Sequence, residues 1–163
     1  MPEKETIQRA RKDKAQGKAP STQAGEFVRE EMEHIRRGKH GARSTKQAIA
    51  IGLSKARRSG VKLAPPKKGT ASASTRQHAQ RDLQRQHTKP SPTRARAVRS
   101  ALKREGRSAA SRTALARQAR TTARRRGPTA RHRAAVKAVR TKGSTGLHRA
   151  AVKAAATRER HTH

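Results

Sequence analysis

Large apolar side chains are concentrated in one stretch of the chain, residues 26–63. That stretch holds nine of them in 38 positions, whereas the 97 residues after Pro66 hold only eight. Within it, apolar positions twice recur with the i, i+4, i+7 spacing of one helix face, first over 28–35 and again over 49–56. The pattern predicts two short amphipathic helices that fold back on each other as an αα-hairpin. We expect its core to contain Phe27, Met32, Ile35, Ile49 and Leu53.

The residues between and after these helices predict where each helix ends. Gly38 can adopt the left-handed conformation that closes the first helix. Ser44, with Gln47 three positions later, is typical of a capping box at the start of the second helix. Ser59-Gly60 closes that helix, and the following apolar residues, Val61 and Leu63, are expected to lie across the seam.

The regions on either side of the hairpin have weaker apolar patterns. Residues 2–16 predict a short polar helix, weakly held because Ile7 is its only large apolar side chain. Pro65-Pro66 should end the compact region, since proline cannot donate a backbone hydrogen bond. Residues 67–92 have a linker composition with a transient helix over 76–86. We therefore expect a module over 1–66, a linker over 67–92 and a tail over 93–163.

The tail is rich in alanine and arginine, and glycines divide it into four helix-prone segments. These segments are 93–105, 108–126, 129–142 and 147–160. Residues 132–138 and 148–154 both read HRAAVKA, an internal repeat of basic helix. Ordering a residue costs roughly 1–2 kcal/mol of backbone entropy, which eight scattered large apolar residues do not offset. The expected fold is therefore all-α, with a largely disordered, helix-prone cationic tail.

Charge is distributed very unevenly. Residues 1–34 are neutral, with seven basic and seven acidic groups, so the whole net charge of +33 lies in residues 35–163. Such an excess is typical of proteins that neutralise nucleic-acid phosphates. The candidate phosphate-binding residues are Lys39, Arg43, Lys46, Arg57, Arg58, Lys67, Lys68, Lys103, Arg104, Arg117, Arg124, Arg125, Arg126, Arg133, Lys137, Arg149 and Lys153.

The scarcity of aromatic residues indicates which nucleic acid is bound. Readers of single strands stack bases on aromatic rings, and this chain has Phe27 but no Trp or Tyr. Duplex DNA bound through its backbone needs only Lys, Arg and helix N-termini, so sequence-independent DNA binding by a nucleoid-associated or histone-like protein is the leading interpretation. The alternatives are a structured-RNA or ribosome-associated protein and a protein-docking adaptor with a localising tail. A true helix-turn-helix is a lesser alternative, because the predicted turn of seven residues exceeds the usual 3–4.

Catalytic, metal and membrane functions find little support in the sequence. No Ser-His-Asp or Cys-His arrangement can be assigned, and we expect no enzyme activity and no cofactor. The eight histidines do not fall at metal-ligand spacings, and only the terminal pair His161 and His163 suggests weak, incidental metal binding. The acidic residues of 26–33 are interpreted as a solvated face with a Glu33–Arg37 pair, or as a patch that docks the tail or a partner. There is no cysteine, signal peptide or membrane span, so a cytoplasmic, nucleoid location is expected.

Two runs carry a resemblance to a known family. They are TQAGEFVREE at 22–31 and GKHGARSTKQAIAIGLSKARR at 38–58. Together they resemble a family of small basic bacterial proteins classed as a domain of unknown function, over about residues 2–66. The tail is similar to bacterial histone H1-like proteins in composition only. The resemblance implies a bacterial cytoplasmic protein and brings no site residues.

Overall fold

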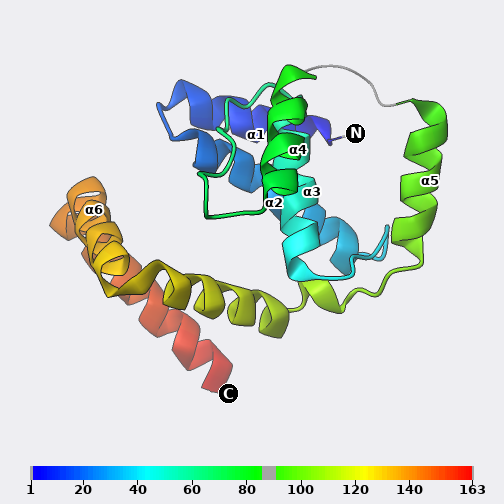
Figure 1. Ribbon diagram of the computed structural model, residues 1–163. Helices are drawn as coiled ribbons and strands as arrows, with labels where there is room; N and C mark the ends of the chain where they lie inside the picture. Colours follow the sequence, from blue (N-terminus) through cyan, green and yellow to red (C-terminus); the bar gives the residue numbers. More distant parts are fainter. Residues whose placement is uncertain (1, 86–90, 163) are drawn as a thin grey trace. The chain divides into compact units, whose positions relative to one another are not determined.

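The computed structural model describes residues 2–85 and 91–162, with side chains up to residue 160. The helices are α1 (Lys4–Ala15), α2 (Pro20–Arg36), α3 (Thr45–Arg58), α4 (Ala73–Gln84), α5 (Pro92–Lys103) and α6 (Arg112–Thr162), with a 3-10 turn, η1, at Ser108–Ala110 (Figure 1). The predicted all-α class is confirmed. Contacts divide the chain into two compact units, residues 1–118 and 119–163, so the first unit includes the predicted linker and the start of the predicted tail.

The predicted boundaries between α2 and α3 are confirmed. Gly38 has φ +73°, its amide donates to the Ile35 carbonyl at 3.1 Å, and the Lys39 amide donates to the His34 carbonyl at 2.9 Å. This pair of hydrogen bonds is the Schellman motif that ends many helices. At the other boundary the Ser44 hydroxyl accepts from the Gln47 amide at 3.2 Å, which caps α3.

The hairpin packs closely because Gly52 lies where α3 crosses α2. A Cβ built on Gly52 would lie 2.7 Å from Val28 Cα, closer than real Cβ contacts come, so only glycine allows this approach. Phe27 and Ile35 are fully buried and Met32 is 5% exposed, while Ile49 and Leu53 are partly buried at the edges of the core. Val61 is buried and Leu63 packs beside it, as predicted.

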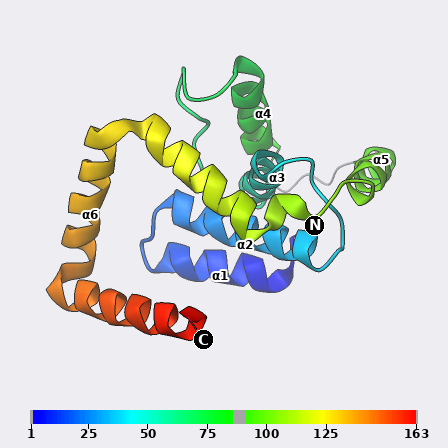
Figure 2. The ribbon, with the colours of Figure 1, turned by 90° about the horizontal axis from the view of Figure 1, so that it is seen from below.

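Helix α1 is packed more firmly than its sequence predicts. It runs alongside α2 in both ribbon views (Figures 1 and 2), and Ile7 and Ala10 join the cluster around Phe27. Arg9 Nε donates to Glu26 Oε2 of α2 at 2.6 Å. We expected a weakly held helix because we counted only large apolar residues, whereas α1 contributes a small one, Ala10, and an ion pair. The hairpin is therefore the larger part of a three-helix module.

The turn η1 closes the far side of this module. Ala109 and Ala110 are buried in a cluster with Met32, Ile35 and Ala48. Two backbone carbonyls of the turn accept hydrogen bonds from the hairpin, Ala110 from Arg36 Nε at 2.9 Å and Ala109 from Thr45 Oγ1 at 2.7 Å. The compact region thus continues past Pro65-Pro66 and includes residues near 109 in the sequence.

Residues beyond 70 are largely helical, which differs from the expected disordered tail. Helix α4 covers much of the segment predicted as a transient helix, although residues 86–90 lie outside the described part of the chain. Helix α6 changes direction at Gly127 and Gly143, where φ is +73° and +64°, and so matches two of the predicted divisions. It continues through Gly146. The difference follows from the high helix propensity of Ala and Arg. We had expected the entropy cost of ordering an unpacked chain to outweigh that propensity.

Candidate nucleic-acid interface

The predicted phosphate-binding residues of α6 are all exposed. They lie on the three segments separated by Gly127 and Gly143, and they are Arg117, Arg124, Arg125, Arg126, Arg133, Lys137, Arg149 and Lys153. Because none of residues 112–160 is buried, the cationic side chains extend from every side of the helix. These side chains could contact phosphates without any change in the packing of the core.

The charge density of α6 is high. Its 51 residues include fifteen Arg and Lys against one acidic residue, Glu159. At a rise of 1.5 Å per residue, this places one positive charge about every 5 Å along the helical path. Duplex DNA carries one negative charge per roughly 1.7 Å of axis, so each basic residue can find a phosphate within reach.

The predicted cations of the first unit differ in their surroundings. Those that are exposed are Arg43, Lys46, Lys67, Lys68, Lys103 and Arg104. Lys39 is exposed but forms an ion pair with Glu3, with Nζ 2.7 Å from Oε1. Arg58 is half-buried.

Arg57 has a structural position. It is 6% exposed, and its guanidinium donates to the carbonyls of Leu63 and Ala64 at 3.1 and 3.5 Å. Burial lowers the pKa of Arg57 below its ordinary value. These bonds hold the chain that leaves α3, so we assign Arg57 to the fold and not to phosphate binding.

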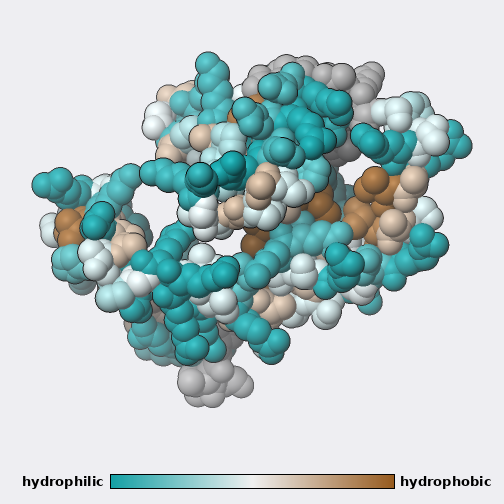
Figure 3. All heavy atoms as spheres, viewed as in Figure 1, coloured by the Kyte–Doolittle hydropathy of each residue, from teal (hydrophilic) through white to brown (hydrophobic). Residues whose placement is uncertain are grey.

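Hydrophilic side chains cover most of the face shown in Figure 3, with only small apolar groups between them. The apolar residues of the tail helices follow the same pattern, since Val98, Val136, Val139 and Val152 are between 45% and 55% exposed. Val98 lies on α5 of the first unit and the other three lie on α6, where Val136 and Val139 are one turn apart, and these few residues cannot form a packed layer. The second unit therefore offers charge and little apolar contact area.

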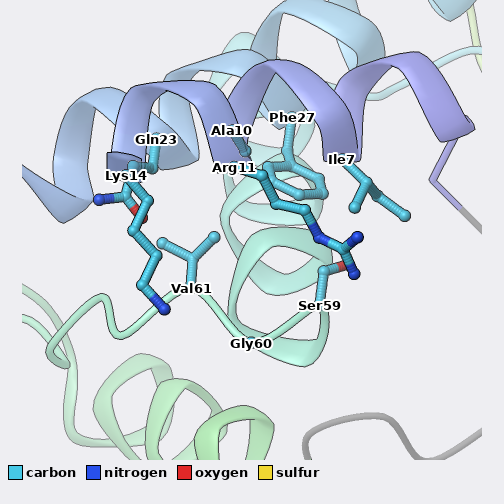
Figure 4. Close-up of a pocket in the computed structure, with 9 residues that line it drawn as sticks. All are labelled: Ile7, Ala10, Arg11, Lys14, Gln23, Phe27, Ser59, Gly60 and Val61. Carbon is cyan, nitrogen blue, oxygen red and sulfur yellow. The ribbon is translucent and has the colours of Figure 1, made fainter. Parts of the chain in front are cut away.

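A small pocket of about 200 Å³ lies between α1, α2 and the end of α3 (Figure 4). Its floor includes Phe27 and Val61, and the side chains of Arg11 and Lys14 extend past its mouth. The pocket is the open edge of the Phe27 cluster, where α1 meets the hairpin.

The acidic residues of α2 are not the solvated face that we predicted. Glu30 and Glu31 are 3% and 0% exposed, because α1, α3 and the loop after α2 cover them. Their cationic partner is Lys55 of α3, whose Nζ lies 3.4 Å from Glu30 Oε1 and 2.6 Å from Glu31 Oε2. The predicted Glu33–Arg37 pair is present at 3.6 Å. Within the described residues, the acidic cluster is thus paired inside the first unit.

The structure also brings together histidines that the sequence spacing did not connect. One ring nitrogen each of His34 and His40 and a carboxylate oxygen of Glu31 lie within 4.8 Å of one another. Glu3 adjoins this group: hydrogen bonds from Lys39 and then from His34 lower the pKa of Glu3 to about 2. The signal in the sequence was Glu31-x-x-His34, which places both residues on one face of α2. We missed it because His40 reaches the group only through the turn at Gly38.

Comparison with known proteins identifies one family. Residues 11–68 match the model of a family of unknown function, DUF6496, which confirms the predicted resemblance to an uncharacterised domain. The matched segment contains the last five residues of α1, all of α2 and α3, and the buried Glu30 and Glu31. No curated protein and no solved structure matches the chain. Among the described helices, none is both long and apolar enough to cross a membrane.

Proposed function

We propose that the protein binds double-stranded DNA through its backbone phosphates, without reading base sequence, as a nucleoid-associated, histone-like protein. The tail supplies the phosphate contacts, and the three-helix module anchors it or docks a protein. No catalytic step is part of this function.

The observation that carries the proposal is the exposure of the basic residues of α6. Fifteen cations on one helix lie on segments with no buried residue among 112–160, and one acidic residue opposes them. A protein that neutralises phosphates releases condensed counterions, and this release supplies most of the affinity of non-specific DNA binding. Base readout would need a shaped surface of side chains, and α6 has an even distribution of charge instead.

The position of Phe27 favours duplex over single-stranded partners. Phe27 is the only Phe, Trp or Tyr residue of the chain, and it is 1% exposed in the core of the first unit. It cannot stack on a base without unfolding the module. Single-strand binding by base stacking is therefore disfavoured, whereas contacts to a duplex backbone need no aromatic side chain.

The helices of the second unit should depend on the bound polyanion. Neighbouring Arg and Lys side chains on α6 repel one another, and no buried apolar face offsets that repulsion. Phosphates that pair with these side chains remove the repulsion. We therefore expect helix content to be lower in the free protein than in the complex, and to rise as duplex DNA is added.

A salt titration of charge variants tests the proposal. The full chain is titrated with duplex DNA at several salt concentrations, and log affinity should fall linearly with log salt, by about 0.9 per phosphate contacted. Replacing Arg124, Arg125 and Arg126 with Gln should reduce that slope by up to about 2.7. The matched control replaces three exposed cations of α1, Lys4, Lys12 and Lys14, with Gln and should change the slope by less than about 1.

Two results would overturn the proposal. Equal effects of the two triple variants would show that overall charge, and not the tail, determines binding. Preferential binding to ribosomal RNA in a competition with duplex DNA would assign the charge to an A-form partner instead. AT-rich and GC-rich duplexes should bind alike, so a strong preference for one base composition would contradict backbone binding.

A further inference from the structure

The cluster of Glu31, His34 and His40 has the composition and hydrogen bonding of a metal site. Glu31 and His34 come from the last turns of α2, and His40 comes from the loop that follows. The side chains of His34 and His40 are 12% and 14% exposed, and that of Glu31 is fully buried. An ion could therefore reach the two imidazoles from solvent, with the carboxylate behind them.

Each imidazole uses one nitrogen for a hydrogen bond that determines which nitrogen carries the proton. His34 Nε2 lies 2.8 Å from Glu3 Oε1, and His40 Nδ1 lies 3.1 Å from the Gly41 carbonyl oxygen. Both oxygens can only accept, so we assign the N–H groups to these two nitrogens. In neutral imidazoles this leaves lone pairs on His34 Nδ1 and His40 Nε2. Ligand histidines in metal sites commonly donate their second nitrogen to a carboxylate or a backbone carbonyl in this way.

The carboxylate of Glu31 lacks the hydrogen bonds that a buried charge requires. Neither oxygen accepts a well-directed hydrogen bond from any described residue, although Lys55 Nζ forms an ion pair with Oε2 at 2.6 Å. The other oxygen, Oε1, lies 3.4 Å from the lone-pair nitrogen His40 Nε2. Two acceptors that face each other at this distance repel unless a cation lies between them. A separation of about 3.4 Å is also the distance between two ligands of a tetrahedral Zn²⁺ with bonds near 2.1 Å.

The local charge balance leaves room for a cation. The acidic groups around the cluster are Glu3, Glu30 and Glu31, and the basic groups in contact with them are Lys39 and Lys55. With neutral imidazoles this sum is one negative charge in a mostly buried place. Glu30 Oε1, 4.0 Å from His34 Nδ1, is a further oxygen near the group.

We propose that Glu31, His34 and His40 form a binding site for a divalent transition-metal ion of the Zn²⁺ class. Imidazole and carboxylate ligands suit this class, and three protein ligands leave a fourth position for water or for Glu30. Glu3 is a positioning residue, because it acts on the ion through His34. The bound ion would fasten the loop of His40 to α2, so its role is structural. The site does not depend on the proposed binding of DNA.

Zn²⁺ titration of the full chain tests the site. Residual metal is first removed with a chelator, and His161 and His163 are replaced with Ala in every protein so that the terminal pair cannot bind. Calorimetry should then show one Zn²⁺ per chain. His40→Ala and Glu31→Gln should each weaken the affinity at least tenfold, whereas His132→Ala, which removes an exposed histidine of α6, should leave it unchanged. Co²⁺ in the same site should give the visible absorption of a tetrahedral complex, which His40→Ala should abolish.

The competing explanation is that His40 carries a second proton and pairs with Glu31 directly. In that case Zn²⁺ would show no saturable binding, and that result would overturn the proposal. A weakening of the Zn²⁺ affinity by less than tenfold in His40→Ala would overturn it as well. His40 lies in a loop and is partly exposed, so this variant should fold even if Glu31→Gln does not. Its helix content without metal, measured by circular dichroism, should equal that of the parent. Zn²⁺ should then raise the melting temperature of the parent but not of His40→Ala.

Discussion

Helices α2 and α6 show how differently two helices of one chain can be supported. Helix α2 buries seven of its 17 residues, among them Phe27 and Ile35, and packs on α1, α3 and η1. Helix α6 has 51 residues and none buried between 112 and 160. Both are helical, but tertiary packing supports α2 along its length, whereas α6 packs against the core at Leu115 near its start and otherwise depends on helix propensity. Helical structure in a segment of this protein therefore does not show that the segment belongs to a hydrophobic core.

Phe27→Ala should have the largest effect on stability, because it removes packing that supports α2 and has no counterpart in α6. Removing the only Phe, Trp or Tyr side chain of the protein from the core should lower the free energy of unfolding by about 3–5 kcal/mol. Thermal and urea unfolding followed by circular dichroism would show a much less stable cooperative transition. An unchanged transition would mean that α2 is held by something other than the cluster around Phe27.

Gly52→Ala tests the close crossing of α2 and α3. The added Cβ would overlap the Val28 backbone, so the helices would have to separate, at a cost of about 1–3 kcal/mol. Gly25→Ala is the matched control, because Gly25 is an exposed position of α2 with no atom within 4 Å of the new Cβ. It should stabilise the protein by roughly 0.5–1 kcal/mol. Melting curves that shift in the same direction for both variants would contradict the crossing.

Ser44→Ala should have a smaller effect, confined to the start of α3. Loss of the bond from the Gln47 amide should cost about 0.5–2 kcal/mol. Ser59→Ala, at the other end of α3, should cost less, because no side-chain bond of Ser59 caps the described helix. Chemical unfolding of the two variants side by side provides the measurement, and equal losses would remove the special role of Ser44.

Val139→Ser should have the smallest effect. Val139 is 52% exposed on α6, and an exposed substitution away from special features changes stability by less than about 0.5 kcal/mol. The cooperative transition of the protein should stay where it is, as measured by the same thermal unfolding. A clear shift would show that the second unit has a packed face after all, and the contrast between α2 and α6 would fail.

The parts of the fold that could be predicted are those with a local chemical signature. The periodic apolar residues predicted α2 and α3, Gly38 predicted the end of α2, and Ser44 predicted the start of α3. The docking of Ala109 and Ala110 could not be predicted, because an Ala pair in an Ala-rich tail looks like every other Ala pair. It depends on small side chains that let backbone carbonyls approach Arg36 and Thr45.

The candidate site divides in the same way. The exposed cations of α6 follow from the local composition of the tail. The environment of Glu31 and His40 does not, since it depends on α1 and on the turn at Gly38, which bring distant residues onto α2. Arg57 shows the converse error, because a basic residue within a basic run turned out to be a buried donor to the Leu63 carbonyl.

The attachment of η1 has a mechanical consequence. The chain runs from α3 to α6 through residues 59–111, but η1, just before α6, is itself bound to α2 and α3. Tension on α6, such as a moving DNA segment would exert, would reach the α2–α3 hairpin through the bonds of Arg36 and Thr45. The covalent path through α4 and α5 would carry no tension until these bonds, and those that the Gly41 and Ala42 amides donate to the Leu102 and Gly106 carbonyls at 2.8 and 3.0 Å, had broken. The turn η1 and the loop after α2 therefore form a mechanical joint, which keeps force on α6 away from α4 and α5 until a threshold force is exceeded.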